Sequence, residues 1–414
     1  KARFWLSLLI FMSCYNGVYA QKSDMRVTLD GALTMAFTDN YNLMAKRAEL
    51  QSVRAGEITA ALRPNPIFKS QVWNIGGVRG NYGTKTTDIN GGIQATVETA
   101  GKRNRRIDLS IENSSISELE LSDLYRLISF DVKAAYIGVL SGRAKLDLAT
   151  QNLKNIDEVE QLQKLRASRG DISELELLRI QGQRLGFETD AVDARAALKT
   201  ALITLRQIVS PERLPENFDV AGELKPRSIA NVNSKDLHSR ALDQRADVRA
   251  AVAAIERAKA DYNLQVAKSY PDILPEASYN TTHDNGEYAL IAVAIPLPIF
   301  DRNQGEIARA ISDIERYSRL ADAVKAQATA DVDRAITAFN EASKKYFLIR
   351  DTYLPKAQTA RDRLNSTYKK GVASLIDYLD AERTYRETAK ANLNALTEYL
   401  IAIAQIEAAI GGSL

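Results

Sequence analysis

The sequence contains the same unit twice, and each copy has the same order of segments. A short helix is followed by two strands, a much longer helix and a second short helix. The first copy opens near Leu29 and the second near Ser234, and their openings align without a gap, so that Ala36 matches Ala241. Helices of this length beside so few strands cannot enclose a core as the packed layers of one globule. The duplication therefore predicts one subunit of a larger assembly.

The duplication also defines the expected regions of the chain. These are a signal peptide at 1–20, a first repeat at 21–209, a linker at 210–234, a second repeat at 235–410 and a short tail at 411–414. Prolines in the linker prevent it from continuing the helices on either side. We expect the linker to form a belt outside the helices.

The first residues have the pattern of a secretory signal. Lys1 and Arg3 precede an apolar stretch, and the small residues Val18 and Ala20 fit a cleavage site after Ala20. Cleavage there removes Cys14, the only cysteine of the sequence. Disulfides and thiolate sites are therefore not expected in the mature protein.

The charge balance gives no case for nucleic-acid binding. The formal net charge is +3, and basic and acidic residues are interspersed along the expected helices, as on solvated faces. After residue 20 no stretch approaches the ~18–20 apolar residues of a membrane helix, and the longest run, Tyr288–Phe300, contains two prolines. The exported protein is therefore expected to be soluble or to span a membrane as a β-barrel.

Four segments are expected to be strands with one apolar and one polar face. They are Ile67–Val78, Thr87–Glu98, Ile273–Thr282 and Glu287–Phe300. In the second of them Ile89 and Ile93 fall on one face, whereas Asn90 and Gln94 fall on the other. Alternating strands of about 10 residues are typical of outer-membrane barrels. Four strands leave open edges, which lipid forbids, so several copies must close the sheet together.

The remaining segments are expected to be helices of two lengths. They are Leu29–Leu62, Lys102–Ser168, Ile172–Val209, Asp236–Lys268, Arg302–Lys369 with a break at Pro355, and Leu375–Ile410. The two long helices of roughly 67 residues would span about 100 Å. Laid end to end, Ile172–Val209 with Asp236–Lys268, and Leu375–Ile410 with Leu29–Leu62, would match that reach. This length match predicts a cylindrical wall of helices.

Three sequence runs resemble a known family. The run from Tyr368 to Ala381 resembles the Y-x-x-G-x-x-x-x-x-D-x-L-D-A signature of the TolC-like outer-membrane factors. The run from Ile295 to Gly305 resembles the strand-to-helix corner of their cobalt-zinc-cadmium (CzcC-like) branch. Gly101 opens the equivalent corner of the first copy.

The resemblance implies a mainly α fold with a small β part. Three subunits, each giving four strands, would form a twelve-strand transmembrane β-barrel in outer-membrane lipid above a periplasmic α-barrel tunnel. The homotrimer would be a passive duct, without a cofactor or enzymatic activity, that exports divalent heavy-metal cations. A periplasmic adaptor and an inner-membrane pump of the resistance-nodulation-division (RND) class would be its partners. Type I secretion, drug efflux and a periplasmic helical scaffold without a pore are the alternatives.

Two acids near the end of the signature are candidates for the pore entrance. Asp377 and Asp380 are three residues apart and share a helix face. In a trimer they would place a ring of carboxylates at the tip, which favours cations. The pattern Ser374-x-x-Asp377 also fits a capping box, so Asp377 has a structural alternative.

The resemblance assigns a gate at the tip to Glu176 and Tyr368. Their basic partner is open, because drug-exporting members carry arginine where this chain has Ala373. The candidates are Arg169, Lys369 and Lys370.

Glycines and prolines mark the expected turns. Gly170 and Gly371 follow the long helices, where glycine accepts the left-handed conformation, and should form the tip turns. Pro296 and Pro298, which a helix interior would not tolerate, should mark the corner between barrel and tunnel, with Gly101 at the matching corner.

The sequence offers no pattern for metal coordination or catalysis. His238 and His283 are the only histidines, and neither has a second ligand at suitable spacing. No nucleophile–base pair or glycine-rich phosphate loop is present either. We therefore expect no resident metal site.

Overall fold

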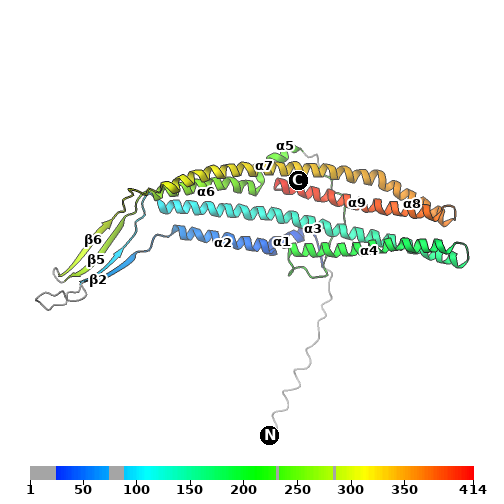
Figure 1. Ribbon diagram of the computed structural model, residues 1–414, viewed down its shortest axis with the longest axis horizontal. Helices are drawn as coiled ribbons and strands as arrows, with labels where there is room; N and C mark the ends of the chain where they lie inside the picture. Colours follow the sequence, from blue (N-terminus) through cyan, green and yellow to red (C-terminus); the bar gives the residue numbers. More distant parts are fainter. Residues whose placement is uncertain (1–24, 74–87, 230–232, 283–285) are drawn as a thin grey trace, which may run out of the picture.

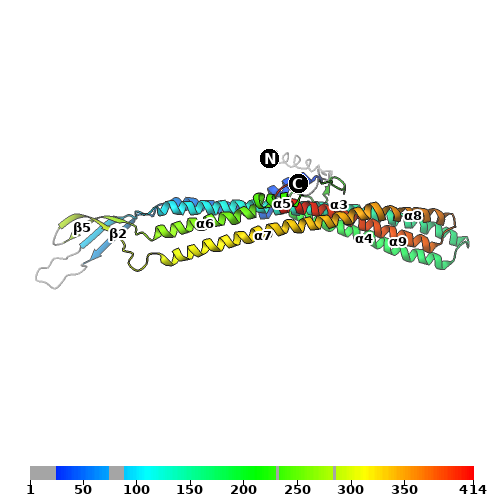
Figure 2. The ribbon, with the colours of Figure 1, turned by 90° about the horizontal axis from the view of Figure 1, so that it is seen from above.

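A computed structural model describes residues 25–73, 88–229, 233–282 and 286–414. The chain is an elongated rod with a sheet at one end. At the other end two short turns each join a pair of helices, and the C-terminus lies near the middle of the rod (Figures 1 and 2). The signal peptide predicted at 1–20 lies outside the described residues.

Both repeats contain the expected order of elements. The first comprises α1 (Leu29–Asp39), α2 (Tyr41–Ala61), β2 (Ile67–Trp73), β3 (Asp88–Gln94), α3 (Lys102–Ser168) and α4 (Glu174–Val209). The second comprises α5 (Ser234–Gln244), α6 (Ala246–Lys268), β5 (Leu274–Thr282), β6 (Gly286–Ala294), α7 (Gln304–Leu348), the π-helical turn η1 (Ile349–Tyr353), α8 (Leu354–Lys369) and α9 (Leu375–Ile410). The short strands β1 (Arg26–Val27) and β4 (Asp219–Val220), which the sequence did not indicate, pair in parallel.

The opening helix of each repeat is divided, so the expectation of unbroken helices over Leu29–Leu62 and Asp236–Lys268 is wrong. The breaks fall at Asn40 and Arg245, which are equivalent positions with nearly the same backbone angles (φ −66°, ψ 125° and φ −64°, ψ 126°). The Asn40 side chain accepts hydrogen bonds from two backbone N–H groups at the start of α2, at 2.9 and 3.1 Å. This N-cap starts a new helix although the apolar periodicity continues through the break.

The half-length helices also stack differently from the prediction. α4 ends against the start of α2, where the Asn40 amide donates a 2.7 Å hydrogen bond to the carbonyl of Ile208 (Figure 1). α9 ends against the start of α6, where Gly411 has φ 78° and a Cβ added to it would lie 3.2 Å from the Cα of Arg245. Each stacked pair comes from one repeat. The long helix carries the chain from the sheet to the tip, and the following half-length helix returns it to the level at which that repeat began.

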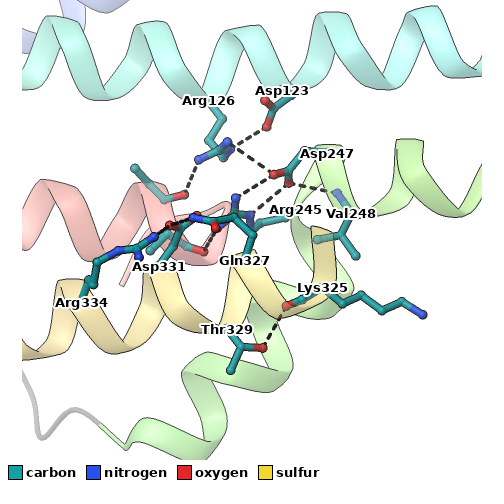
Figure 3. A network of polar contacts seen from close by, with 12 residues as sticks. Asp123, Arg126, Arg245, Asp247, Val248, Lys325, Gln327, Thr329, Asp331 and Arg334 are labelled. Atoms are coloured by element: carbon teal, nitrogen blue, oxygen red, sulfur yellow. Dashed lines mark hydrogen bonds and ion pairs between the residues drawn. The ribbon is translucent and has the colours of Figure 1, made fainter. Parts of the chain in front are cut away.

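The buried guanidinium group of Arg245 lies at the junction between α9 and α6 and bonds to both sides of it (Figure 3). The Arg245 side chain is only 4% exposed and makes two ion-pair contacts with Asp247, at 2.7 and 3.0 Å. It also contacts Asp331 of α7 at 3.0 Å and donates to the carbonyl of Ala409 at 3.4 Å. Burial is compensated here by two carboxylates and a helix C-terminus, as a buried charge requires.

Arg126 of α3 completes this network from the neighbouring helix. It pairs with Asp123 at 2.7 Å, lies 4.0 Å from Asp247, and donates to the carbonyl of Ala408 at 2.9 Å (Figure 3). Two guanidinium groups therefore bind the last carbonyls of α9, where the helix dipole is negative. The network links α3, α6, α7 and α9 near the middle of the rod.

The linker between the repeats packs against the helices in the middle of the rod. Leu214, Phe218 and Val220 are buried in a cluster with α1, α3 and α4. Further along, the carbonyl of Arg227 accepts a 2.7 Å hydrogen bond from the hydroxyl of Tyr399 on α9. The linker thus crosses from the first repeat to the second on the outside of the helices.

The two long helices differ in one respect. α3 runs without interruption, whereas its counterpart contains η1 directly before Pro355. In this turn the N–H of Leu354 bonds to the carbonyl of Ile349, five residues back, so the helix continues past a proline that lacks an N–H.

The sheet has the order β2-β3-β5-β6, with antiparallel neighbours and its two outer strands unpaired on one side among the described residues. The register places Ile93 and Ala277 on one face and the hydrogen-bonded pair Asn90 and Asn280 on the other, as the alternation predicted. β3 and β6 are shorter than expected, since they end at Gln94 and Ala294.

Burial in this sheet is the reverse of that in a water-soluble protein. On the apolar face Phe68 is 72% exposed and Ile291 is 83% exposed, whereas on the polar face Ser278 is 6% and Asn280 is 3% exposed. Gly92 makes room on the polar face, because a Cβ there would lie 2.6 Å from the Cβ of Ser278. The sheet curves around its polar side chains and presents its apolar side outward.

One helix corrects the expectation that no segment is apolar enough to cross a membrane. α9 passes that test by length and composition, but 56% of its most apolar window is buried inside the structure. It packs against α3, α7 and α8. Burial explains its composition, and it is a wall helix of the rod.

Replacement of Arg245 tests the junction between α9 and α6. Arg245→Met should lower the free energy of unfolding by about 3 kcal/mol, because it leaves two partly buried carboxylates without their shared partner. Arg334→Met is the matched control: this arginine contacts the same Asp331 at 2.5 Å but is 61% exposed, so its loss should cost about 0–1 kcal/mol. Urea unfolding in detergent, followed by far-UV circular dichroism, measures both. Equal effects of the two substitutions would contradict a special stabilising role of the buried Arg245 at this junction.

Candidate functional site

The end of the rod opposite the sheet is built from two matching turns. Gly170 follows α3 with φ 79°, and its N–H bonds to the carbonyl of Ala167 at 3.0 Å while the N–H of Asp171 bonds to that of Arg166 at 2.9 Å. The same pair of bonds recurs around Gly371, which has φ 77°. This is the Schellman arrangement, in which a left-handed glycine ends a helix. Both glycines therefore reverse the chain sharply at the tip.

A serine caps the helix that leaves each turn. Ser173 accepts from the N–H of Glu176 at 3.3 Å, and Ser374 accepts from the N–H of Asp377 at 3.1 Å. The Ser374 hydroxyl also donates to the Asp377 carboxylate at 2.7 Å. Asp377 thus takes part in a capping interaction while it remains exposed.

The second entrance acid is exposed as well. Asp380 is 62% exposed and pairs with Arg383, one turn along α9, at 2.6 Å. The sequence interpretation overlooked this arginine, although a spacing of three residues on a helix indicates such a pair. Arg383 offsets part of the negative charge that Asp380 brings to the tip.

Behind the turns lies a buried pair of tyrosines. Tyr368 is 5% exposed, and its ring stacks on that of Tyr378 with centroids 5.0 Å apart and planes 7° apart. Burial raises the pKa of the Tyr368 hydroxyl, the Arg166 charge counteracts this rise, and the nearby Glu176 charge adds to it. Glu176 of the first repeat is therefore near enough for its charge to act on Tyr368 within one chain.

The basic residue beside Tyr368 is Arg166, and the three candidates from the sequence are not in that position. The Arg166 guanidinium lies 5.9 Å from the centre of the Tyr368 ring and donates to the carbonyl of Lys369 at 3.2 Å. Arg166 precedes Gly170 by one helical turn. Arg169, Lys369 and Lys370 instead lie beside the two glycines, and all three are exposed.

A buried carboxyl group, also missed from the sequence, adjoins the tyrosine pair. Glu382 is 3% exposed and accepts a hydrogen bond from the hydroxyl of Tyr378. Burial raises the pKa of Glu382, although the Arg361 charge and the Tyr378 bond counteract this rise. The sequence spacing indicates this contact, because Glu382 follows Tyr378 by four residues and side chains at that spacing share a helix face.

The corner between sheet and rod is held by polar contacts in the first repeat. Gly101 caps α3 with φ 69°, and Lys102 pairs with Asp272 at 2.6 Å. The same carboxylate accepts from the N–H of Thr99 at 3.0 Å. These contacts tie the start of α3 to the segment that leads into β5 of the second repeat.

The second corner has a different construction. Pro296 and Pro298 lie in the extended segment between β6 and α7. Asn303, with φ 59°, starts α7 in the place that Gly101 takes for α3, and its amide donates to the carbonyl of Gln265 at 2.7 Å. The segment ends in Phe300, which is 91% exposed.

No group of three or more His, Cys, Asp or Glu side chains is placed to hold a metal ion within the part of the chain that the structure describes. His238 bonds to Asp333 at 2.8 Å, and His283 lies outside the described residues. The charged groups at the tip include the exposed acids Asp377 and Asp380, and a packed aromatic pair lies behind them.

Comparisons with known proteins agree with this geometry. The sequence profile of the family described as "Outer membrane efflux protein" matches residues 38–210 and 237–412. The cobalt-zinc-cadmium resistance protein CzcC of Cupriavidus metallidurans is 26% identical over 95% of this chain and 92% of its own length. The pyoverdine export outer membrane protein OpmQ of Pseudomonas aeruginosa is 24% identical over 93% of this chain and 85% of its own.

The fold recurs in solved structures. A crystal structure of CusC superposes with a TM-score of 0.76 at 19% identity, covering 93% of this chain and 92% of that one. At this identity the likeness establishes the fold.

The buried Glu382 predicts a pH-dependent tip. Because burial raises its folded-state pKa, its ionisation should cost stability as the pH rises above the usual value of 4.5. Glu382→Gln should therefore slow amide hydrogen exchange severalfold around residues 366–382 at pH 7.5 and change it little at pH 4. Glu387→Gln, at an exposed site on the same helix, is the control. Faster exchange in the Glu382 variant at pH 7.5 would contradict the assignment.

Proposed function

Because this chain belongs to the outer membrane efflux protein family, we propose that three copies of it form one duct that exports divalent heavy-metal cations. The chain is an outer-membrane efflux channel with a periplasmic tunnel and has no enzymatic role. The proposal adds the trimer, the closed twelve-strand barrel and the class of cargo.

The inverted burial of the sheet carries the proposal. Exposed apolar side chains on one face suit lipid, and covered polar side chains on the other suit a water-filled lumen. β2 and β6 are open edges among the described residues, and lipid does not tolerate unpaired backbone groups. Pairing β6 of one copy with β2 of the next removes every edge when the ring closes. This also argues against a scaffold without a pore.

The rod supplies a wall of matching height. Each copy contributes α3, the line α7–η1–α8 and two stacked pairs, α2 with α4 and α6 with α9. A helix of the length of α3 spans about 100 Å, which allows one wall from sheet to tip. Repetition of these four lines around an axis produces a tunnel.

The heavy-metal assignment rests on two observations. The relative CzcC is named for resistance to cobalt, zinc and cadmium. The exposed Asp377 and Asp380 would place acids of three copies at one constriction and so favour cations. The name of OpmQ, by contrast, refers to pyoverdine export. Type I secretion and drug efflux are the alternatives within the interpretation as a duct.

The duct needs partners that supply energy. We propose a periplasmic adaptor at the tip and an inner-membrane RND pump behind it, as the family resemblance implies. By the same resemblance the duct is a passive conduit, and the pump and the adaptor supply its energy and selectivity.

Loss of the protein tests the class of cargo. A deletion strain should become more sensitive to cobalt, zinc and cadmium, and the intact gene supplied in trans should restore growth. Sensitivity to hydrophobic drugs, measured on the same plates, should not change. Increased drug sensitivity with unchanged metal tolerance would favour the alternative.

The tip acids predict cation preference. In planar bilayers the double substitution Asp377→Asn with Asp380→Asn should shift the reversal potential in a salt gradient toward zero, because it removes negative charge from the entrance. Asp322→Asn, at an exposed site on α7 away from the tip, should leave it unchanged. An unchanged reversal potential in the double variant would contradict the pore-lining role, and the absence of any channel would contradict the duct.

A further inference from the structure

A cavity of about 200 Å³ lies between three helices on the tip side of the rod. α3, α4 and α9 line it, it is open to solvent on one side, and its walls include Leu148 and three alanines. Six polar or charged side chains also line it: Lys145, Asn152, Asp190, Asp193, Arg386 and Lys390. None of them takes part in the tip turns or the corners.

Asn152 is the first sign of a missing ligand. Its side chain lines the cavity and the residue is 3% exposed, yet its amide forms no hydrogen bond with any residue that the structure describes. The amide atoms of Asn152 are reached by solvent from the cavity and are not among the described polar atoms that are both closed off and unpaired. A carboxylate in the cavity would replace water as their hydrogen-bond partner.

Lys145 is the second sign. It is half-buried on the same face of α3, two turns before Asn152, and forms no ion pair within the described chain. Burial lowers the pKa of its ammonium group, and the charge of Lys390 lowers it further, against a smaller opposing effect of Glu398. A negative charge in the cavity would stabilise this ammonium group.

The acids that line the cavity do not fill this role. Asp190 is shared between Arg386 and Lys390, each at 3.5 Å. Asp193 is exposed at the rim and forms no ion pair with the described residues. Three cations face two acids, so the lining carries an excess of one positive charge.

We propose that this cavity binds a small monocarboxylate with an apolar body. The carboxylate accepts hydrogen bonds from Lys145 and from the Asn152 amide, and the apolar body lies against Leu148 and its aliphatic neighbours. A single negative charge balances the excess of the lining, and the walls exclude strongly hydrated anions. The residues that line this cavity are different from the acids proposed at the entrance.

Benzoate is a suitable probe, and benzamide is its neutral counterpart of the same shape. Isothermal titration of the full chain in detergent should show benzoate binding at least tenfold tighter than benzamide. Lys145→Met and Asn152→Leu should each weaken benzoate binding at least fivefold. Lys154→Met, at an exposed lysine of the same helix, should not change it.

A measurement on the unaltered protein covers the case of a variant that does not fold. Acetylation of Lys145 by an N-hydroxysuccinimide ester, followed by mass spectrometry, should slow when benzoate is present, while acetylation of Lys154 should not. Equal binding of benzoate and benzamide, or no protection of Lys145, would overturn the proposal and indicate that water or the Asp193 side chain occupies the cavity. Neither outcome depends on whether the protein conducts metal ions.

Discussion

The rod depends on what happens where its half-length helices end. The last carbonyl groups of a helix have no partners within it, and α4 and α9 both end in the middle of the wall. Asn40 supplies a neutral amide donor at one junction, and Arg245 supplies a guanidinium at the equivalent position of the other. Without these donors two short helices would leave a polar gap at mid-height, and no continuous wall could form.

The two repeats share one backbone arrangement, and differences between their side chains give the two hairpins at the tip different contacts. Both tip turns have the same glycine geometry and the same serine cap. Only the second repeat contributes the stacked Tyr368 and Tyr378 and the buried Glu382 beside them. The backbone of the tip is therefore symmetric between repeats, whereas the stacked tyrosines and the buried Glu382 come from the second hairpin and pack against apolar residues of the first.

The sequence predicted features that follow from local patterns and missed those that depend on distant contacts. The apolar and polar faces of the strands were predicted correctly, because their alternation is visible in adjacent residues such as Ile89 and Asn90. The breaks at Asn40 and Arg245 were missed because the apolar period passes through them, and the stacking partners were misassigned because length alone does not say which ends meet. Arg166 was missed because it reaches Tyr368 from another helix. The burial of Glu382 likewise required the packed structure.

The outward apolar face of the sheet has a consequence for biogenesis. A lone subunit cannot rest in water, where Phe68 and Ile291 would be wetted, and cannot enter lipid, where the rims of β2 and β6 would lack partners. A separate subunit is therefore poorly solvated both in water and in lipid. If several copies close one barrel, as proposed above, their association and their entry into the membrane should therefore be coupled.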